Sequence, residues 1–267
     1  MYERDQKRLR ATFDEAAELY DRARPGYPPD LCEDVVQLAG IGAGSRVLEL
    51  GPGTGQMTVP LAERGCQLVA VELGADMAAI LQRKVARFPS VAVVVSAFED
   101  WTLPAEPFDA VISATAFHWI DPKVRVTKVV DALKPGGALA IISTHHILGG
   151  DEDFFVEVQT CYERYDPTTS PGLRLPTAEQ IPAGTEEFES SGQFGPMFTR
   201  RYERTLAYST DEYLDLLLTY SGHRALAPEA RAHLLACIAY LIDSHYGGRV
   251  RKRYLFELQV AHRRSDH

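Results

Sequence analysis

The residues best suited to chemistry stand where an apolar segment meets three closely spaced glycines. The stretch Val47-Leu48-Glu49-Leu50-Gly51-Pro52-Gly53-Thr54-Gly55-Gln56 places a carboxylate two residues before the first glycine. Glycines let the backbone turn tightly and approach a ligand without a Cβ in the way. A glycine-rich turn can also be a plain connector between a strand and a helix, so the motif needs support from elsewhere in the chain.

The spacing of these glycines limits the classes of ligand that the turn could bind. No Lys-Ser or Lys-Thr pair follows them, so the turn is not a P-loop. The pattern is G-x-G-x-G, not the G-x-G-x-x-G of dinucleotide-binding enzymes. Glu49 would repel a pyrophosphate and attract a ligand that carries a sulfonium and an ammonium group. S-adenosylmethionine is such a ligand, and it has no phosphate.

Further candidates follow the next apolar segments. Glu72 lies about twenty residues after Gly51, where an acid can accept two hydrogen bonds from ribose hydroxyls; a solvated acid at a helix start is the alternative. Leu73 and Met77 would then wall the adenine. Phe98 is a candidate to pack on the base, and a core aromatic is the alternative. Small residues after the fourth segment would let the sulfonium and methyl group sit close to the backbone: Ala114, Thr115 and Ala116.

Histidines that follow the fourth and fifth apolar segments are candidates for an acceptor-binding or basic group. His118 is the first choice for a base or for a group that orients the acceptor, and His145 and His146 come next. A hydrogen-bonded structural imidazole is the alternative for each of them.

The elements that must position these residues alternate between strands and helices. Strands are predicted over 46–50, 67–72, 91–95, 108–113 and 138–142, and helices over 29–39, 56–64, 75–87 and 122–133. Near-continuous apolar strands are typical of a parallel sheet that is covered on both faces. The alternation predicts a doubly wound α/β sheet.

The pattern changes after about residue 145. Helices are predicted over 151–165, 211–220 and 228–246, strands over 198–206 and 254–262, and mainly loop over 166–196. We expect the last two strands to form the antiparallel end of the same sheet, with the helices as a substrate cover over one edge. The basic run at 249–253 is expected to be a solvated strand entry.

The composition limits the partners. The chain has 267 residues, of which 45% are hydrophobic and 24% charged, and a net charge of −9. An acidic chain is a poor match for nucleic acid or an anionic membrane. The charged N-terminus predicts no secretory signal, and no apolar run predicts a membrane span. We therefore expect a soluble cytoplasmic protein, either a monomer or a homodimer, that acts on a small molecule.

The cysteines are far apart in the sequence. They are Cys32, Cys66, Cys161 and Cys237, and none belongs to a CxxC pair. This spacing predicts reduced, mostly buried thiols and no metal site.

These motifs together resemble class I S-adenosylmethionine-dependent methyltransferases. The resemblance rests on Glu49 to Gly55, Glu72 and Ala116-Phe117-His118-Trp119, and it is closest to the small-molecule type-11 group that includes trans-aconitate methyltransferase-like proteins. The turn Leu133-Lys134-Pro135-Gly136-Gly137 and the lead-in segments 13–17 and 20–28 also resemble the family. The likeness covers residues 10 to 145 well and is looser from 190 to 264.

The resemblance implies a fold and a set of roles. The fold would be a Rossmann-like, doubly wound, seven-stranded sheet, mostly parallel with the last strand antiparallel. Tyr20 and Arg24 would help close over the cofactor. Many relatives carry an acid where Ala97 stands, so adenine recognition would rely on the backbone. The other implied contacts are Glu49, Gly51, Gly53, Gly55 and Gln56 for the methionine end, Glu72 for the ribose, and Ala97 with Phe98 for the adenine.

The expected organisation is one methyltransferase domain over residues 1–267. Residues 1–28 would be a lid segment, 29–144 the cofactor-binding core, and 145–190 and 207–248 the substrate-cover insertions. The expected reaction is direct in-line transfer of a methyl group from S-adenosylmethionine to a small molecule, which leaves S-adenosylhomocysteine. An NAD(P)-dependent oxidoreductase and a cofactor-binding relative without methyl transfer are the alternatives.

Overall fold

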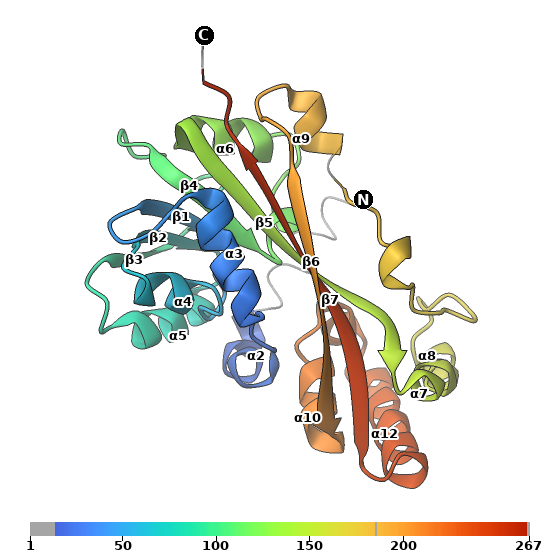
Figure 1. Ribbon diagram of the computed structural model, residues 1–267. Coiled ribbons are helices and arrows are strands. Elements are labelled where there is room, and N and C mark those ends of the chain that lie inside the picture. The colour runs from blue at the N-terminus through green and yellow to red at the C-terminus, as the bar shows by residue number, and fades with distance from the viewer. Residues whose placement is uncertain (1–13, 185, 266–267) are drawn as a thin grey trace. The chain divides into compact units, whose positions relative to one another are not determined.

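Seven strands form one mixed sheet in a computed structural model that describes residues 14–184 and 186–265 (Figure 1). The strand order is β3-β2-β1-β4-β5-β7-β6. The strands are β1 (Arg46–Leu50), β2 (Gln67–Glu72), β3 (Val91–Val95), β4 (Phe108–Ala114), β5 (Leu133–Gly150), β6 (Phe198–Ser209) and β7 (Arg249–His262). Strands β1 to β5 pair in parallel.

The last strand, β7, runs against its neighbours. At one end, the Arg263 N–H donates to the Gly137 carbonyl at 2.8 Å, and at the other the Asp151 N–H donates to the Arg251 carbonyl at 3.0 Å. Residue numbers therefore rise along β5 as they fall along β7. The predicted Rossmann-like sheet with an antiparallel last strand is confirmed.

The helices also follow the sequence closely in the first half of the chain. The predicted helix over 29–39 has these bounds in the structure, whereas 151–165 divides into two helices at Val158, and the predicted loop over 166–196 contains α9. The helices are α2 (Ala17–Ala23), α3 (Pro29–Ala39), α4 (Thr58–Glu63), α5 (Ala75–Val85), α6 (Arg125–Ala132), α7 (Glu152–Glu157), α8 (Gln159–Tyr165), α9 (Glu186–Ser191), α10 (Thr210–Leu217), α11 (Ser221–Ala225) and α12 (Pro228–His245). In the described part of the chain, no helix has the length and apolarity that crossing a bilayer requires.

The chain divides into two compact units, and the predicted roles of its segments remain predictions. The glycine-loop unit comprises Pro25–Thr144, Ala183–Tyr202 and the described residues from Phe256 onward. The disulfide unit comprises the described residues up to Arg24, His145–Pro182 and Glu203–Leu255. Residues 1–13 of the predicted lid, which include Phe13 of the family-like lead-in, lie outside the described residues.

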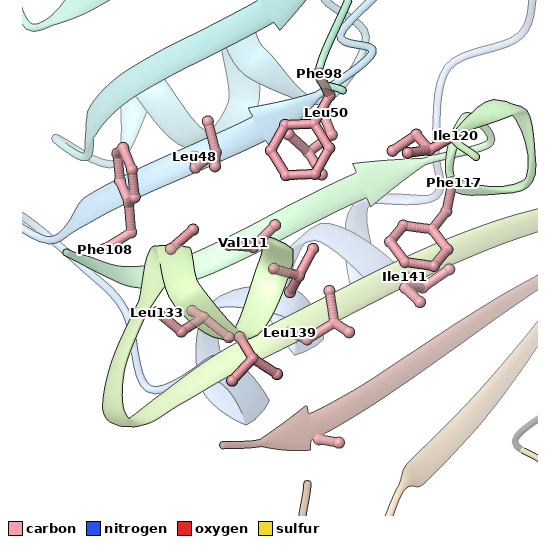
Figure 2. Packing of buried hydrophobic residues seen from close by; sticks show 14 of the residues in the cluster. Leu48, Leu50, Phe98, Phe108, Val111, Phe117, Ile120, Leu133, Leu139 and Ile141 are labelled. Carbon is pink, nitrogen blue, oxygen red and sulfur yellow. The ribbon is translucent and has the colours of Figure 1, made fainter. Parts of the chain in front are cut away.

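The core of the glycine-loop unit lies on both faces of its sheet. Leu48, Leu50 and Val71 belong to a buried cluster with residues of α6 and α9 (Figure 2). The neighbour of Val71 in β2, Ala70, belongs to a different cluster with Leu81 of α5. Because successive side chains of a strand point to opposite faces, helices cover the sheet on both sides. This burial holds the strand ends, and the loops that follow them, in place.

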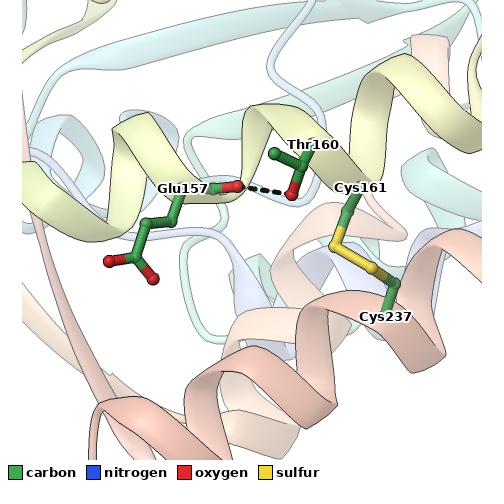
Figure 3. The surroundings of a disulfide bond; sticks show 4 residues. All are labelled: Glu157, Thr160, Cys161 and Cys237. Atoms are coloured by element: carbon green, nitrogen blue, oxygen red, sulfur yellow. Dashed lines mark hydrogen bonds between the residues drawn. A yellow bond between two sulfur atoms is a disulfide. The ribbon is translucent and has the colours of Figure 1, made fainter.

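The disulfide unit corrects one prediction. Cys161 of α8 and Cys237 of α12 form a disulfide with a Cα–Cα distance of 5.8 Å (Figure 3). Cys32 and Cys66 are free and buried. The prediction of four reduced thiols was wrong for the first pair, because 76 residues separate its members and only the packing of α8 on α12 brings them together. Sequence spacing does not reveal such a contact.

Candidate functional site

The glycine turn after β1 and the loop after β4 touch each other. Gly51 has a φ of +64°, and a Cβ added to it would lie 2.5 Å from the Ala116 Cβ. Only glycine fits such a backbone at such a close approach. The Ser113 hydroxyl also donates to the Leu50 carbonyl at 3.1 Å, which ties the end of β4 to the end of β1. Two of the predicted site loops are therefore brought together.

Glu72 joins the end of β2 to the same turn. One carboxylate oxygen, Oε2, accepts the Gly53 N–H at 2.9 Å, and the other, Oε1, accepts the Gly74 N–H at 2.9 Å. The side chain is only 9% exposed. Each carboxylate oxygen can accept more than one hydrogen bond, so ribose hydroxyls can still be received there. Glu72 lies where the sequence predicts it, and its contact with ribose remains a prediction.

Glu49 is a buried acid without a complete hydrogen bond. It is 1% exposed, and among the described residues no donor completes a hydrogen bond to either carboxylate oxygen. Burial raises its pKa to about 7, the charge of Glu72 adds to this rise, and the nearby Thr58 hydroxyl opposes it. A buried carboxylate without a partner is costly. A ligand that brings a cationic group to Glu49 would stabilise its ionised form.

The loop after β4 also holds a strained residue. Thr115 has a φ of +59°, and it is the only non-glycine residue with a positive φ in the described ranges. This is unusual for a β-branched side chain. Its hydroxyl lies 3.1 Å from the Tyr27 hydroxyl and 3.2 Å from the Thr144 hydroxyl. No local sequence pattern marks this chain of hydroxyl groups, so Tyr27 and Thr144 were not among the predicted site residues.

The predicted adenine contacts differ in their surroundings. Phe98 belongs to the buried cluster of Figure 2, which is the core position that the sequence left as an alternative. Met77 is buried, Leu73 is 37% exposed, and the Ala97 carbonyl accepts the Trp101 N–H at 3.0 Å. Their contacts with a base remain predictions.

The side chain of Gln56 forms a hydrogen bond within the glycine turn. Its side-chain amide donates to the Thr54 hydroxyl at 2.9 Å, and the Gly55 N–H donates to the Pro52 carbonyl at 3.0 Å. These bonds fix the turn that precedes α4. A direct role for Gln56 in holding the methionine end remains a prediction.

His118 has the protonation state that a base requires. It lies in a short 3-10 helix over Phe117–Trp119. Partial desolvation and the positive charge of Arg125 lower its pKa below the usual 6.5. His118 is therefore mostly neutral at pH 7 and able to accept a proton. His145, the other candidate base, belongs to the disulfide unit.

Tyr20 and Arg24 also belong to the disulfide unit. The Arg24 guanidinium lies over the Tyr20 ring at 5.0 Å and over the Tyr220 ring at 4.4 Å. Its Nε donates to the Thr219 hydroxyl at 2.8 Å, and its Nη2 donates to the Thr219 carbonyl at 3.1 Å. The structure thus brings Tyr20 and Arg24 together, and their closure over a cofactor remains a prediction.

The basic run at 249–253 is exposed to solvent as predicted at its three arginines but not at its lysine. Arg249, Arg251 and Arg253 are exposed, as a solvated strand entry requires, whereas Lys252 is 4% exposed. The strand alternation turns every second side chain inward. The apolar residue at 250 and the aromatic residue at 254 lie on the same face of the strand as Lys252. This pattern would have predicted that Lys252 is buried.

Taken together, the site residues of the glycine-loop unit meet at one edge of the sheet. Strands β1, β2 and β4 are parallel, so their carboxyl ends lie at the same edge, where ligands of open α/β sheets bind. This edge carries a buried acid at Glu49, hydrogen-bond acceptors at Glu72 and a close backbone approach at Gly51. The arrangement suits a ligand that has a cationic group and a diol but no phosphate.

Part of the chain is similar to known methyltransferases. Residues 47–137 match the profile of a protein family described as "Methyltransferase domain". Uncharacterized methyltransferase Rv3342 of Mycobacterium tuberculosis is 36% identical over 131 residues, which cover 49% of this chain and 51% of that protein. The chain thus spans about half the length of the curated relatives that it matches.

Solved structures show the same fold. YcgJ protein from Bacillus subtilis is similar with a TM-score of 0.53 and 16% identity, over 89% of this chain and 99% of that one. Haemonchus contortus Phospholethanolamine N-methyltransferase 2, in complex with phosphomonomethylethanolamine and S-adenosylhomocysteine, is similar with a TM-score of 0.52 and 19% identity, over 95% of this chain and 58% of that one. At these identities the likeness is one of fold.

Proposed function

We propose that the chain carries a class I methyltransferase domain and that it transfers a methyl group from S-adenosylmethionine to a small-molecule acceptor. The observation that carries this proposal is Glu49, a buried carboxylate whose oxygens accept no complete hydrogen bond from the described residues. It stands two residues before a glycine turn that has no room for a Cβ at Gly51. A cationic, phosphate-free nucleoside fits both features.

The residues present fit this cofactor. Glu49 would pair with the ammonium of the methionine end, and Glu72 would accept the ribose hydroxyls. The loop over Ala114, Thr115 and Ala116 would admit the sulfonium close to the backbone. A nicotinamide cofactor fits less well, because its pyrophosphate would meet Glu49 at the turn and because the glycine spacing differs from that of dinucleotide-binding enzymes.

The chain's own residues have limited chemistry to perform. When bound, S-adenosylmethionine supplies a methyl group on a sulfonium that leaves as a neutral thioether. The glycine turn and the loop after β4 position the reacting groups and exclude water. His118, neutral at pH 7 because its pKa is lowered, would remove a proton from the acceptor where the reaction requires it. His145 is the second candidate for this role.

We assign the choice of acceptor to residues 145–190 and 207–248. Most of these residues belong to the disulfide unit, whereas the cofactor residues from Glu49 to Ala116 belong to the other unit. Replacing these segments should change which acceptor is methylated and leave the affinity for S-adenosylhomocysteine intact. The finer grouping, with type-11 and trans-aconitate methyltransferase-like enzymes, is part of this proposal. The net charge of −9 favours a small molecule over nucleic acid.

We also propose that the protein works in the cytoplasm. Cytoplasmic thiols are kept reduced, so the redox state in the cell of Cys161 and Cys237, which are bonded in the structure, tests this proposal. Alkylation of thiols before lysis, followed by mass spectrometry, should show both residues modified. Protection of both from alkylation would place the protein in an oxidising compartment instead.

Calorimetry separates the cofactor classes directly. The folded protein is titrated with S-adenosylhomocysteine and, separately, with NADH. We expect heat of binding with the first and none with the second. Heat with NADH alone would favour the oxidoreductase alternative and contradict the proposal.

A labelled-methyl assay then tests the reaction. The protein is incubated with methyl-labelled S-adenosylmethionine and a cell extract, which is separated into small molecules, nucleic acids and proteins. Label in the small-molecule fraction is expected. Label in a macromolecular fraction would contradict the acceptor class, and binding without any transfer would indicate the non-methylating alternative.

A further inference from the structure

Lys252 is a buried amine with no counter-charge. Its side chain lies on β7 in the disulfide unit and is 4% exposed. Within the described ranges its Nζ has neither a hydrogen bond nor an ion pair. Burial, with the positive charge of Arg24 adding to it, lowers its pKa to about 7. An ammonium in such a place is costly unless a partner for it is supplied.

Aromatic rings surround this amine. The Lys252 Nζ lies 5.4 Å from the ring centroid of Tyr220 and 5.5 Å from that of Tyr254. The rings of Tyr213 and Phe155 follow at 5.7 and 6.0 Å. These faces attract the ammonium weakly, and they also offer flat apolar walls. The amine therefore stands among four aromatic rings.

A second cation shares one of these rings. The Arg24 guanidinium lies 4.4 Å from the Tyr220 ring centroid, so Arg24 and Lys252 both face this ring. The Tyr220 hydroxyl is 3.1 Å from the His146 Nε2. Burial and the charges of Lys252 and Arg24 lower the pKa of His146 well below its usual value. His146 is thus neutral and leaves the two cations without compensation.

The surrounding titratable groups do not supply a negative charge to Lys252. His223 is neutral at pH 7, because burial and Lys252 lower its pKa to about 4, and Asp166 acts on His223 in the opposite direction. The other groups that face the cluster are His145, Tyr162 and Tyr208, and burial raises the pKa of both tyrosines. No described carboxylate lowers the cost of charging Lys252.

We propose that the cluster of Lys252, Arg24, His146, Tyr213, Tyr220 and Tyr254 binds the carboxylate of a small aromatic acid. The carboxylate pairs with two cations that the protein leaves without a counter-charge, and charge-assisted hydrogen bonds of this kind are strong. The tyrosine rings enclose the aromatic body of the acid. Binding stabilises the Lys252 ammonium, so it is accompanied by proton uptake around pH 7.

The test uses two acids and their neutral amides as probes. Benzoate, phenylacetate, benzamide and phenylacetamide are titrated by calorimetry into the full chain, into Lys252→Met and into Arg251→Met. The last variant is the matched control, because Arg251 is the exposed neighbour of Lys252 on β7 and its removal changes the net charge equally. Circular dichroism verifies that each variant is folded.

We expect at least one of the acids to bind the wild type and Arg251→Met, and its amide not to bind. Its affinity should fall by about tenfold or more in Lys252→Met, the size expected for a lost charge-assisted hydrogen bond. In the wild type the affinity should fall as the pH rises from 6 to 9. Equal binding of acid and amide, equal binding by Lys252→Met, or no binding of either acid would overturn the proposal.

A parallel titration with S-adenosylhomocysteine separates this proposal from the proposed function. Binding of S-adenosylhomocysteine without binding of the acids leaves the methyltransferase assignment standing and overturns the anion site. Binding of an acid without S-adenosylhomocysteine supports the anion site and contradicts the methyltransferase assignment.

Discussion

The two units bury unmatched charges of opposite sign. In the glycine-loop unit the charge is the Glu49 carboxylate, and in the disulfide unit it is the Lys252 ammonium. Burial raises the pKa of the acid and lowers that of the amine, to about 7 in both cases. A ligand of opposite charge would therefore stabilise the ionised form of each group. In our two proposals, Glu49 pairs with a cationic cofactor and Lys252 pairs with the carboxylate of an aromatic acid.

The largest effect on cofactor binding is expected from Gly51→Ala in the glycine-loop unit. The new Cβ would meet Ala116 at 2.5 Å on a backbone with a φ of +64°. Strain of this kind costs about 1–3 kcal/mol. The turn should shift to relieve it, and if the same cost is met again on binding, the affinity for S-adenosylhomocysteine falls by roughly 5- to 150-fold. Calorimetry measures it.

The control for this variant is Gly42→Ala, because an added Cβ at Gly42 meets nothing within 4 Å. It should bind S-adenosylhomocysteine as the wild type does. Wild-type affinity in Gly51→Ala would show that the glycine turn is not the cofactor site.

Removing the disulfide should affect only the other unit. The double variant Cys161→Ala/Cys237→Ala opens a loop closed over 76 residues, and the free energy of unfolding of the disulfide unit should fall by about 2–4 kcal/mol. Hydrogen exchange should become faster in α8 and α12 and remain unchanged in β1 to β4. Reduction of the wild type should reproduce this change and add nothing to the variant. A wild type insensitive to reductant would contradict the disulfide.

The lowered pKa of Lys252 should make the free energy of unfolding depend on pH. Because the pKa of Lys252 is lowered in the folded state, the unfolded chain binds more protons between pH 7 and about 10.5. Wild-type stability should therefore rise over this window relative to Lys252→Met, by about 3–5 kcal/mol between pH 6 and pH 10. Urea denaturation of both proteins at pH 6, 8 and 10 measures the difference. A constant difference would mean that Lys252 titrates normally.

The smallest effect concerns backbone strain beside the glycine turn. Thr115→Gly and Thr115→Ala both lose the hydroxyl contacts with Tyr27 and Thr144. Only glycine adopts a φ of +59° without cost. Thr115→Gly should therefore be more stable than Thr115→Ala by about 1 kcal/mol. The reverse order in thermal denaturation would show that Thr115 is not strained.

The same two units differ in how much of them the sequence predicts. The bounds of β1, β2 and β3 agree with the predicted strands, because short apolar runs between turn residues mark buried parallel strands. Glu49 and Gly51 belong to one short motif, so the residue types of the proposed cofactor site could also be recognised within a single segment of the sequence. The close contact of Gly51 with Ala116 and the positive φ of Thr115 depend on loop geometry, which residue types do not encode.

In the disulfide unit the important neighbours are distant in sequence. Lys252, Tyr220 and Arg24 come from three separate segments, and Cys161 lies 76 residues from Cys237. Helix packing decides these contacts, and periodicity within each segment does not specify them. Of these features, the burial of Lys252 could have been predicted, because side chains along β7 alternate between exposed and buried positions.

The most direct test of the account is a calorimetric titration with S-adenosylhomocysteine from pH 5.5 to 8, in two buffers of different ionisation enthalpy. The pKa of Glu49 is raised to about 7 in the free protein, and the ligand's ammonium favours the ionised carboxylate. Binding below pH 7 should therefore release a proton, and affinity should rise with pH until Glu49 is ionised. Glu49→Gln should bind about tenfold more weakly without this proton release, and Glu63→Gln, an exposed acid of α4, should behave as the wild type. Affinity independent of pH in the wild type, or unchanged in Glu49→Gln, would contradict the account.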